Sequence, residues 1–493
     1  TTVPDVTEAP TDPTEAPPVS DTSPPATGDS PVDTLVEPPD DPTTLFPPIP
    51  AGEFPLDANK PPQDYDGYLM AVLDDIQQFW RDSYPSVYGS PYEELSGGIH
   101  PVYPGKQGVP GCGTPQTSFE DVEGNAFYCQ LGDFVAYDDT TLLPQLKQEL
   151  GAPVIGVVLA HEWGHAIQAR AGLFDQDIPT VYTELQADCF AGSWAAHVNQ
   201  SSGALRFSDK DVKAGLAGMI YVADSPGSSS LDPSAHGSAF DRVGAFEDGF
   251  VRGAVTCGGY MENPPTPIQM EYQASDIDIT TQENAPWDDQ PSCDPANGDS
   301  ASICGIFQLI MPDLHTYWNK LMPEMGDIGL AAYSSDPSSV CSEYRPEQLL
   351  GVAFYCASDN TVYLDPDVAK SLYDDPTLGD FAVGYVVASA WSEAAQERLS
   401  SALSGEARVL VNDCLVGAFS RALLPQENFN PDRDPNINTQ LSPGDLDEAV
   451  KSAILIGDDP ANVNEIGSAF EKIDAFRAGV LGGMAGCQQR ISG

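Results

Sequence analysis

The sequence predicts an α+β fold that is mostly α-helical, contains a small antiparallel sheet and occurs twice in tandem. Three observations lead to this prediction. Segments with the apolar spacing of helices make up most of residues 65–257. Two short apolar runs at 124–138 have the length of paired strands. The same features return in the same order within residues 307–493, which indicates an internal repeat.

The expected elements of the first unit follow the chain from about residue 65. Residues 68–80 have the spacing of an amphipathic helix, and 124–138 predict a hairpin of two strands. One helix is expected to contain 154–165, and the next to contain 183–195. Another begins at Ser208, because Asp211 three residues later resembles a capping box. A last helix is predicted over 240–257.

Two segments have the composition of linkers. Residues 1–62 hold 17 Pro, one Lys and no Arg, so they cannot form a packed core and are predicted to be disordered. They would hold the folded body away from an anchor, or form an inert exported tail. Residues 258–306 are acidic and Pro-rich, and we expect a linker in which Cys293 and Cys304 close a short loop.

Charge and cysteine content restrict the class of protein. The chain of 493 residues has 74 acidic and 21 basic side chains, for a net charge of −53, which excludes nucleic acid and anionic lipid as partners. Ten cysteines indicate disulfides and an oxidising compartment. We therefore expect an exported protein, extracellular or in the cell envelope. An N-terminal signal or membrane anchor is expected to lie outside this chain, which begins with Thr and has no transmembrane run.

The motif HEWGH at 161–165 closes the very apolar run at 154–160. Such a run predicts a buried helix, and residues four apart lie on one face of a helix. His161 and His165 can therefore direct two imidazoles at one metal ion, and Glu162 can reach a water molecule on that ion. Two ligands and a general base in this spacing predict a zinc site with peptidase chemistry.

A third ligand is expected on the next helix, because a catalytic zinc ion is held by three protein ligands. We assign it to Glu184, within TELQADC at 183–189. Asp188 lies four residues later on the same face. We expect the Asp188 carboxylate to accept the N–H of a ligand histidine and to fix the tautomer of that ring.

These motifs resemble those of the bacterial "putative neutral zinc metallopeptidase" family. The resemblance rests on HEWGH, on ELQADCFAG at 184–192, on FYC at 127–129 and on HGS at 236–238, and it covers about residues 65–257. It implies a zincin-like zinc peptidase whose ligands are two histidines and a glutamate. The sequence departs from the family at Ala166, where a further histidine is frequent, but a three-ligand site does not require that residue.

The second half retains the structural motifs of the first half but lacks its candidate catalytic residues. Residues 352–356 match 125–129, 412–417 match 187–192, and 467–470 match 237–240. The positions of His161, Glu162, His165 and Glu184 are taken by Ser389, Ala390, Glu393 and Val409. We therefore expect a zinc metallopeptidase domain at 63–257 and a degenerate, non-catalytic copy at 307–493.

The comparison between the copies also distinguishes catalytic from structural roles for other residues. His236 is replaced in the second copy while its neighbours persist, which predicts a catalytic role as a donor to the tetrahedral oxyanion. Asp188 is retained as Asp413, where no histidine needs orienting, and this weakens the orienting role of Asp188. Trp163 and Gln168 are also retained, which favours packing or structural hydrogen bonding for both.

The repeat also restricts the disulfide pairing, because each copy carries four cysteines at matching places. The first two in each copy flank one hairpin region, so the other two should bridge the helix of Glu184, or its counterpart, to the final helix. The two linker cysteines then pair with each other. The expected bonds are Cys112–Cys129, Cys189–Cys257, Cys293–Cys304, Cys341–Cys356 and Cys414–Cys487.

The predicted function is that of an exported zinc-dependent metallopeptidase. Zinc on His161, His165 and Glu184 would polarise the scissile carbonyl and lower the pKa of its water to about 7. Glu162 would pass the proton of that water to the leaving amine. The expected partners are a peptide or protein substrate and, in the cell envelope, a protein. Two alternatives stay open: an envelope scaffold with a vestigial zinc site, and a zinc hydrolase of a non-peptide amide.

Overall fold

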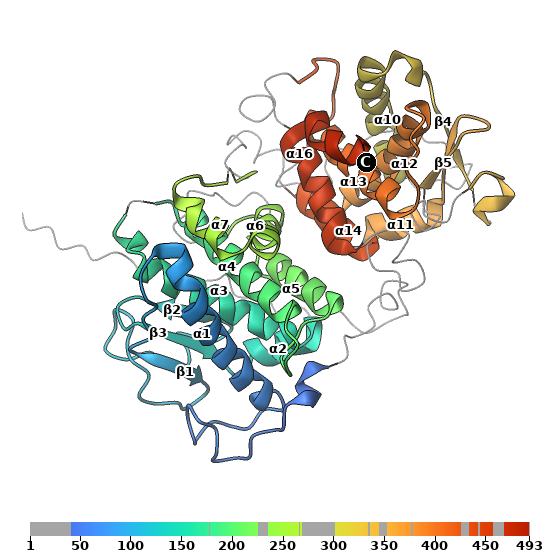
Figure 1. The fold of residues 1–493 in the computed structure, drawn as a ribbon. Helices are drawn as coiled ribbons and strands as arrows, with labels where there is room; N and C mark the ends of the chain where they lie inside the picture. The colour runs from blue at the N-terminus through green and yellow to red at the C-terminus, as the bar shows by residue number, and fades with distance from the viewer. Residues whose placement is uncertain are drawn as a thin grey trace, which may run out of the picture.

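The computed structural model describes residues 41–492 apart from 177, 225–234, 266, 269–300, 334–335, 345–352, 376–377, 425–432, 442–443 and 457–467. The chain forms two units, each with a helical body and a small three-stranded sheet at one side (Figure 1). The α+β class is as predicted.

The first unit begins with the short 3-10 helix η2 (Pro42–Leu45) and the long helix α1. Its elements are α1 (Asp66–Tyr88), β1 (Gly98–Val102), β2 (Ala126–Cys129), β3 (Phe134–Asp138), α2 (Leu142–Leu150), α3 (Pro153–Arg170), η3 (Leu173–Asp175), α4 (Thr180–Asn199), α5 (Asp209–Tyr221), α6 (Ala239–Arg252), α7 (Ala254–Gly258) and η4 (Gly259–Met261).

The second unit has a closely similar order of elements. They are α10 (Ala301–Leu321), η7 (Pro323–Met325), β4 (Gly329–Ala332), η8 (Pro337–Ser339), β5 (Ala353–Cys356), β6 (Thr361–Leu364), α11 (Pro366–Asp374), α12 (Asp380–Arg398), α13 (Glu406–Leu423), α14 (Asp445–Ile456) and α16 (Ala469–Ser492). Both sheets have one strand order, β1-β3-β2 and β4-β6-β5, with the first pair parallel and the second antiparallel.

The predicted hairpin is present as β2 and β3, but the expectation of an antiparallel sheet was wrong for the third strand. Strand β1 runs parallel to β3, with Gly98 opposite Phe134, so the sheet is mixed. The segment GIHPV has no clear alternation of apolar and polar residues, so the sequence pattern did not predict a strand there. Pro101 has no N–H to donate, and it is tolerated because β1 lies at an edge of the sheet.

The predicted helices of the first unit are present, but α2 (Leu142–Leu150) was not predicted and the C-terminal end of the unit differs from the prediction. Helix α5 begins with a true capping box between Ser208 and Asp211. The single helix expected over 240–257 is broken at Gly253, whose φ of 78° is left-handed. The second unit has a break at the corresponding position, Gly483, with φ 57°.

Residues 41–62 do not belong to a disordered segment, which corrects the predicted domain boundary. Lys60 is buried, with Nζ 2.6 Å from a carboxylate oxygen of Asp66 and 2.8 Å from one of Asp139. The buried ring of Phe54 lies 4.7 Å from the same Nζ. Two carboxylates offset the cost of burying the ammonium group, and they attach this segment to the first unit. The predicted linker at 258–306 is likewise shorter, because α10 begins at Ala301.

Helix α4 crosses α6 at very short range, and two glycines permit this. A Cβ atom at Gly192 would lie 1.9 Å from the carbonyl oxygen of Phe246, and one at Gly249 would lie 1.7 Å from that of Cys189. The disulfide between Cys189 and Cys257 joins α4 to α7 beside this crossing. The close packing holds α6 firmly against the helix that carries Glu184.

Four of the five predicted disulfides are present: Cys112–Cys129, Cys189–Cys257, Cys341–Cys356 and Cys414–Cys487. The pair Cys293–Cys304 falls outside the residues and side chains that the structure describes. Within the described part of the chain, none of the helices is long and apolar enough to cross a membrane.

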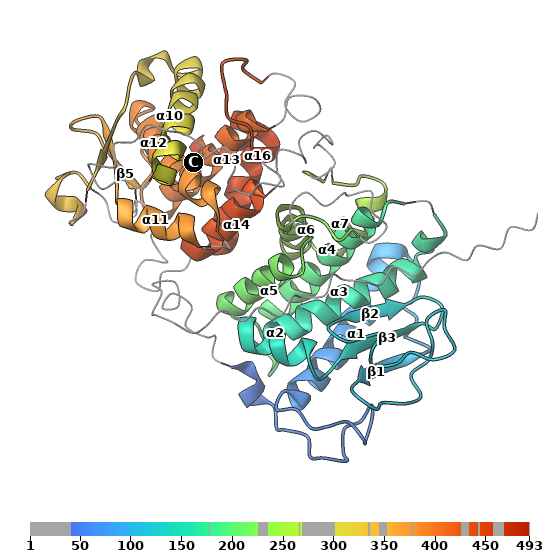
Figure 2. The same cartoon turned by 180° about the vertical axis from the view of Figure 1, so that it is seen from behind.

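The two units meet along a helical interface in which α5 and α6 face α14 and α16 (Figure 2). Phe240 on α6 packs edge-on against Phe476 on α16, with ring centroids 6.3 Å apart. Phe250 contacts Phe470 in a tilted arrangement, with ring centroids 5.0 Å apart. One hydrophobic cluster runs through both units without a gap.

Candidate metal centre

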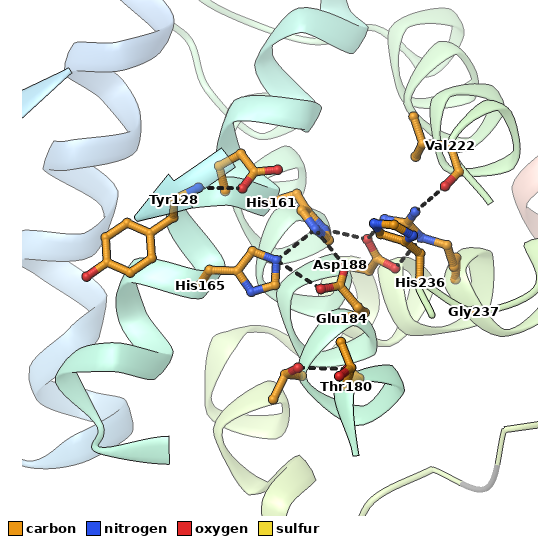
Figure 3. Close-up of polar contacts among 12 residues, drawn as sticks. Tyr128, His161, His165, Thr180, Glu184, Asp188, Val222, His236 and Gly237 are labelled. Carbon is orange, nitrogen blue, oxygen red and sulfur yellow. Dashed lines mark hydrogen bonds and ion pairs between the residues drawn. The ribbon is translucent and has the colours of Figure 1, made fainter. Parts of the chain in front are cut away.

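Helices α3 and α4 bring the predicted ligands together. Helix α3 is buried on nearly every side, as its apolar run predicts, and it presents His161 and His165 one turn apart. Their Nε2 atoms lie 3.1 Å from each other. The carboxylate of Glu184 on α4 places Oε2 3.2 Å from Nε2 of His161 and Oε1 3.3 Å from Nε2 of His165. The three side chains converge on one point (Figure 3).

The outer nitrogens of both rings have defined partners. Asp188 Oδ1 lies 2.7 Å from Nδ1 of His161, which is the predicted contact. Nδ1 of His165 lies 2.9 Å from Oε1 of Gln168, and the amide of Gln168 donates to the backbone oxygen of Thr183. Both Nδ1 atoms must therefore carry a proton, since each faces an acceptor. In the neutral form of both rings, which is the form that binds a metal ion, the Nε2 lone pairs then point at each other.

This donor set fits a zinc ion. Two Nε2 lone pairs 3.1 Å apart cannot hydrogen-bond to each other when both rings are neutral. Oε2 of Glu184 is buried and lacks a hydrogen-bond partner among the described residues. A buried acceptor without a donor is costly, and a cation bound between two imidazoles and one carboxylate would satisfy all three groups. Two nitrogens and one oxygen are the ligands of many catalytic zinc sites.

The surroundings of His161 are strongly negative. Burial alone would lower the pKa of His161, but the carboxylates of Asp188 and Glu184 outweigh it and raise the pKa to about 10. Arg242 on α6 offsets part of this charge: its Nε and Nη2 atoms donate to the two oxygens of Asp188, at 2.8 and 2.7 Å. Without a metal ion, His161 therefore holds a second proton on Nε2, and a zinc ion would replace this proton as the positive charge between the two histidines.

Glu162 lies beside the ligands and is held by the sheet. Its Oε2 atom accepts the backbone N–H of Tyr128 on β2 at 3.0 Å, while the carboxyl group is buried. Burial raises the pKa of Glu162, Glu184 adds to this rise, and His161 and His165 oppose it. A carboxylate with a raised pKa that is fixed next to a metal position has the properties of a general base.

His236 approaches the site from the loop before α6 (Figure 3). Its Nδ1 atom lies 3.3 Å from Oδ1 of Asp224, and Oδ2 of Asp224 accepts the backbone N–H groups of His236 and Gly237. The ring is about half exposed, with a side-chain exposure of 53%. Asp224 thus holds one nitrogen of His236 and leaves Nε2 available to a ligand.

Sequence reasoning missed three side chains of this site. Arg242, Asp224 and Gln168 each contact a predicted site residue, but they lie 54, 12 and 3 positions from the residue they hold. Gln168 was assigned a structural role because the second copy keeps it. The bond of its amide to the backbone of Thr183 agrees with this role, and the structure adds that its Oε1 atom orients His165.

The corresponding positions of the second unit form a different polar cluster. Glu393, at the position of His165, accepts from Nε of Arg408 at 2.7 Å and from the amide of Asn412 at 2.9 Å. All three side chains are buried. The guanidinium group supplies a fixed positive charge in the part of the unit where the first unit gathers its nitrogen ligands.

The retained aspartate also has new partners in the second unit. Asp413 contacts Nζ of Lys472 at 2.8 Å, which corresponds to the contact of Asp188 with Arg242. The hydroxyl of Tyr385 donates to Oδ1 of Asp413 at 2.5 Å. Asp413 therefore keeps an ion pair with α16, as Asp188 does with α6. The hydroxyl of Tyr385 takes the place that the ring of His161 has in the first unit.

Comparison with known proteins places these residues in a family context. A family model described as "Putative neutral zinc metallopeptidase" matches residues 68–260. An uncharacterized protein of Mycobacterium tuberculosis is 31% identical over 210 residues, which is 38% of this chain and 67% of the relative. The uncharacterized protein YpfJ of Escherichia coli K12 is 32% identical over 163 residues, 29% of this chain and 54% of that protein. No solved structure matches the chain.

Proposed function

Because the chain belongs to the "Putative neutral zinc metallopeptidase" family, we propose that residues 63–257 are a zinc-dependent peptidase with a zincin-like fold. One observation carries the proposal. Candidate ligand atoms of His161, His165 and Glu184 lie within 4.8 Å of one another, and Glu162 is fixed beside them. Peptide bonds of a peptide or protein are the proposed substrate.

Three residues would hold the metal, and the others prepare the site. A zinc ion on His161, His165 and Glu184 would supply Lewis acidity toward the scissile carbonyl and would lower the pKa of a water molecule. Asp188 and Gln168 keep the Nε2 lone pairs of the two histidines free by holding their Nδ1 protons.

Proton transfer is assigned to Glu162. Tyr128 occupies one oxygen of the carboxylate, so the other oxygen is left to accept the proton of the attacking water. The same carboxyl group then donates this proton to the leaving amine. His236, with Nδ1 held by Asp224, would donate from Nε2 to the developing oxyanion. The buried, hydrogen-bonded state of Glu162 favours chemistry over a scaffold with a vestigial site.

For the second unit, we propose that it is a degenerate copy of the first. The support is the shared strand order, the glycine break at Gly253 and Gly483, and the matching disulfides. Where the first unit has its candidate metal ligands, the second unit has a buried ion pair between Glu393 and Arg408, which serves a structural role. The second unit therefore has no peptidase activity in this proposal.

Export is the proposed location of the protein. Disulfide bonds persist in oxidising compartments, and four of them lie in the described residues. The strongly acidic composition, with a net charge of −53, favours solubility and suits a protein that works outside the cell or in its envelope.

A peptide-library assay on the full chain tests the proposal. We expect cleavage that is lost after chelation and returns with one equivalent of zinc. In parallel, His161→Ala should lose the bound zinc while remaining folded. Full zinc content in His161→Ala would show that the ligand set is wrong. Zinc binding without any peptide cleavage would instead favour one of the two alternatives, a non-peptide amide as the substrate or a scaffold with a vestigial zinc site.

A further inference from the structure

The contact between the two units includes the first turn of α6, which also serves the metal centre. This turn carries Arg242, whose guanidinium group holds Asp188, and Asp188 in turn holds His161. The loop that enters the same turn carries His236. Any element that fixes the start of α6 therefore acts on two groups of the proposed site.

Asp447 on α14 supplies a cap to α6 from the other unit. Its Oδ1 atom accepts the backbone N–H of Phe240 at 2.8 Å, and the side chain is buried. The helix's own cap, Ser238, is engaged with Asp241. N–H groups in the first turn of a helix have no partner within the helix, so an acceptor from outside stabilises that end.

Arg477 on α16 holds the other side of the same residue. Its Nη1 atom donates to the backbone oxygen of Phe240, and its guanidinium carbon lies 4.4 Å from the centre of the Phe240 ring. Nε lies 3.5 Å from Oε2 of the buried Glu247. Gly244 makes room for this side chain, because a Cβ atom there would lie 1.6 Å from Nη2 of Arg477.

Both backbone polar groups of Phe240 are thus held by the second unit, two residues before Arg242 and four after His236. The path from Arg242 through Asp188 to His161 consists of hydrogen bonds of 2.7–2.8 Å, so a shift of the turn by an ångström would break it. We propose that Asp447 and Arg477 are positioning residues for the metal centre, and that the second unit sets the zinc affinity of the first. This inference rests on the proposed zinc site.

The test uses the full-length protein and the zinc dissociation constant, measured by competition with a chelator. Asp447→Ala removes the cap, and Arg477→Met removes the guanidinium group but keeps an aliphatic side chain. We expect each to weaken zinc binding by about 3- to 10-fold, somewhat less than the 10- to 100-fold typical of a direct partner of a ligand. The absorption spectrum of the cobalt-substituted protein should shift as well.

Phe470→Leu provides the matched control. It removes the contact with Phe250, which lies in the same interface but at the far end of α6. This variant should lose stability and keep the zinc affinity of the wild type. Gly244→Ala gives an independent route, since its methyl group displaces Arg477 without changing that residue. It should weaken zinc binding as Arg477→Met does.

A double-variant cycle separates positioning from general loosening. Asp447→Ala and Arg242→Lys should be non-additive in zinc affinity, because both act through Asp188. Unchanged zinc affinity in Asp447→Ala and Arg477→Met would overturn the inference, and so would an equal loss in Phe470→Leu. A wild-type protein that binds no zinc would refute the proposed function itself, which is a distinct result.

Discussion

At the scale of single residues, the metal centre depends on the groups that hold the ligands in one tautomer. Asp188 and Gln168 receive the Nδ1 protons of His161 and His165, and Arg242 in turn holds Asp188. The two units differ most at these positions. The second unit retains the aspartate and the glutamine, and the glutamine keeps its bond to the backbone, but the two side chains contact Tyr385 and Asn412 rather than a histidine. The same residue type can therefore serve a metal in one unit and packing in the other.

Gln168 and its counterpart Gln396 give a matched pair for a first prediction. Gln168 donates to the backbone oxygen of Thr183, and Gln396 donates to that of Arg408. Replacing either by Leu leaves a buried carbonyl without its donor and should lower the stability of the apo-protein by about 1–3 kcal/mol. Only Gln168→Leu should also weaken zinc binding, by about 10- to 100-fold, because only Gln168 orients a ligand.

Denaturation of the apo-proteins and chelator competition measure the two effects separately. Equal zinc affinities of Gln168→Leu and Gln396→Leu would show that the contact with His165 does not matter for binding.

The site residues that could be predicted from the sequence are those that lie close to one another along the chain. The spacing of His161 and His165 on one helix is visible in the sequence, and Glu184 with Asp188 repeats the same four-residue step. Arg242 could not be found in this way, because its contact with Asp188 arises only when α6 packs on α4. The comparison of the two units contains a signal, since Lys472 makes the contact with Asp413 that Arg242 makes with Asp188.

At the scale of elements, the crossing of α4 and α6 is the contact that brings the site together. Gly192 and Gly249 permit it in the first unit. Gly417 and Gly479 do the same in the second, because a Cβ atom at either would lie about equally close to the backbone of the facing helix. The apolar pattern predicts these helices but not their separation. Strand β1 was missed because its partner β3 lies far along the chain. The helix break at Gly253 was missed because one glycine within an apolar pattern is often tolerated.

Gly192→Ala is therefore expected to destabilise the first unit. The added Cβ atom would lie 1.9 Å from the carbonyl oxygen of Phe246, so the two helices must move apart. We expect a loss of about 1–3 kcal/mol or more in the free energy of unfolding. Gly259→Ala is the control, because its φ is −78° and no atom lies within 4 Å of the added methyl group. Equal melting temperatures for both variants would contradict the close crossing.

At the scale of the whole molecule, the second unit supports the first through buried polar contacts. Asp447 is fully buried where it caps α6. Burial raises the pKa of Asp447 to about 7, and Asp241 adds to the rise, while the N–H of Phe240 and Lys451 oppose it. The native protein therefore retains a proton there at pH values at which the unfolded chain has released it.

This shift predicts the pH dependence of the interface. Because the folded pKa of about 7 exceeds the ordinary aspartate pKa of 3.8, the contribution of Asp447 to stability is greatest at low pH. It falls as the pH rises from about 4 to 7, by at most about 1.4 kcal/mol per pH unit, and then levels off. Other buried carboxylates titrate too, so the difference between wild type and Asp447→Asn is the quantity to measure. A difference that does not change between pH 4 and 7 would refute the shift.

The central claim is that the first unit hydrolyses peptides with Glu162 as the base beside a zinc ion. The most direct measurement is the peptide hydrolysis rate of zinc-loaded Glu162→Gln against the wild type. The amide keeps the size of the side chain and leaves all three ligands in place, so zinc content should not change. The account predicts that turnover falls by about 100- to 10,000-fold, as expected for loss of a general base. Hydrolysis at the wild-type rate by Glu162→Gln, with one zinc bound, would contradict it.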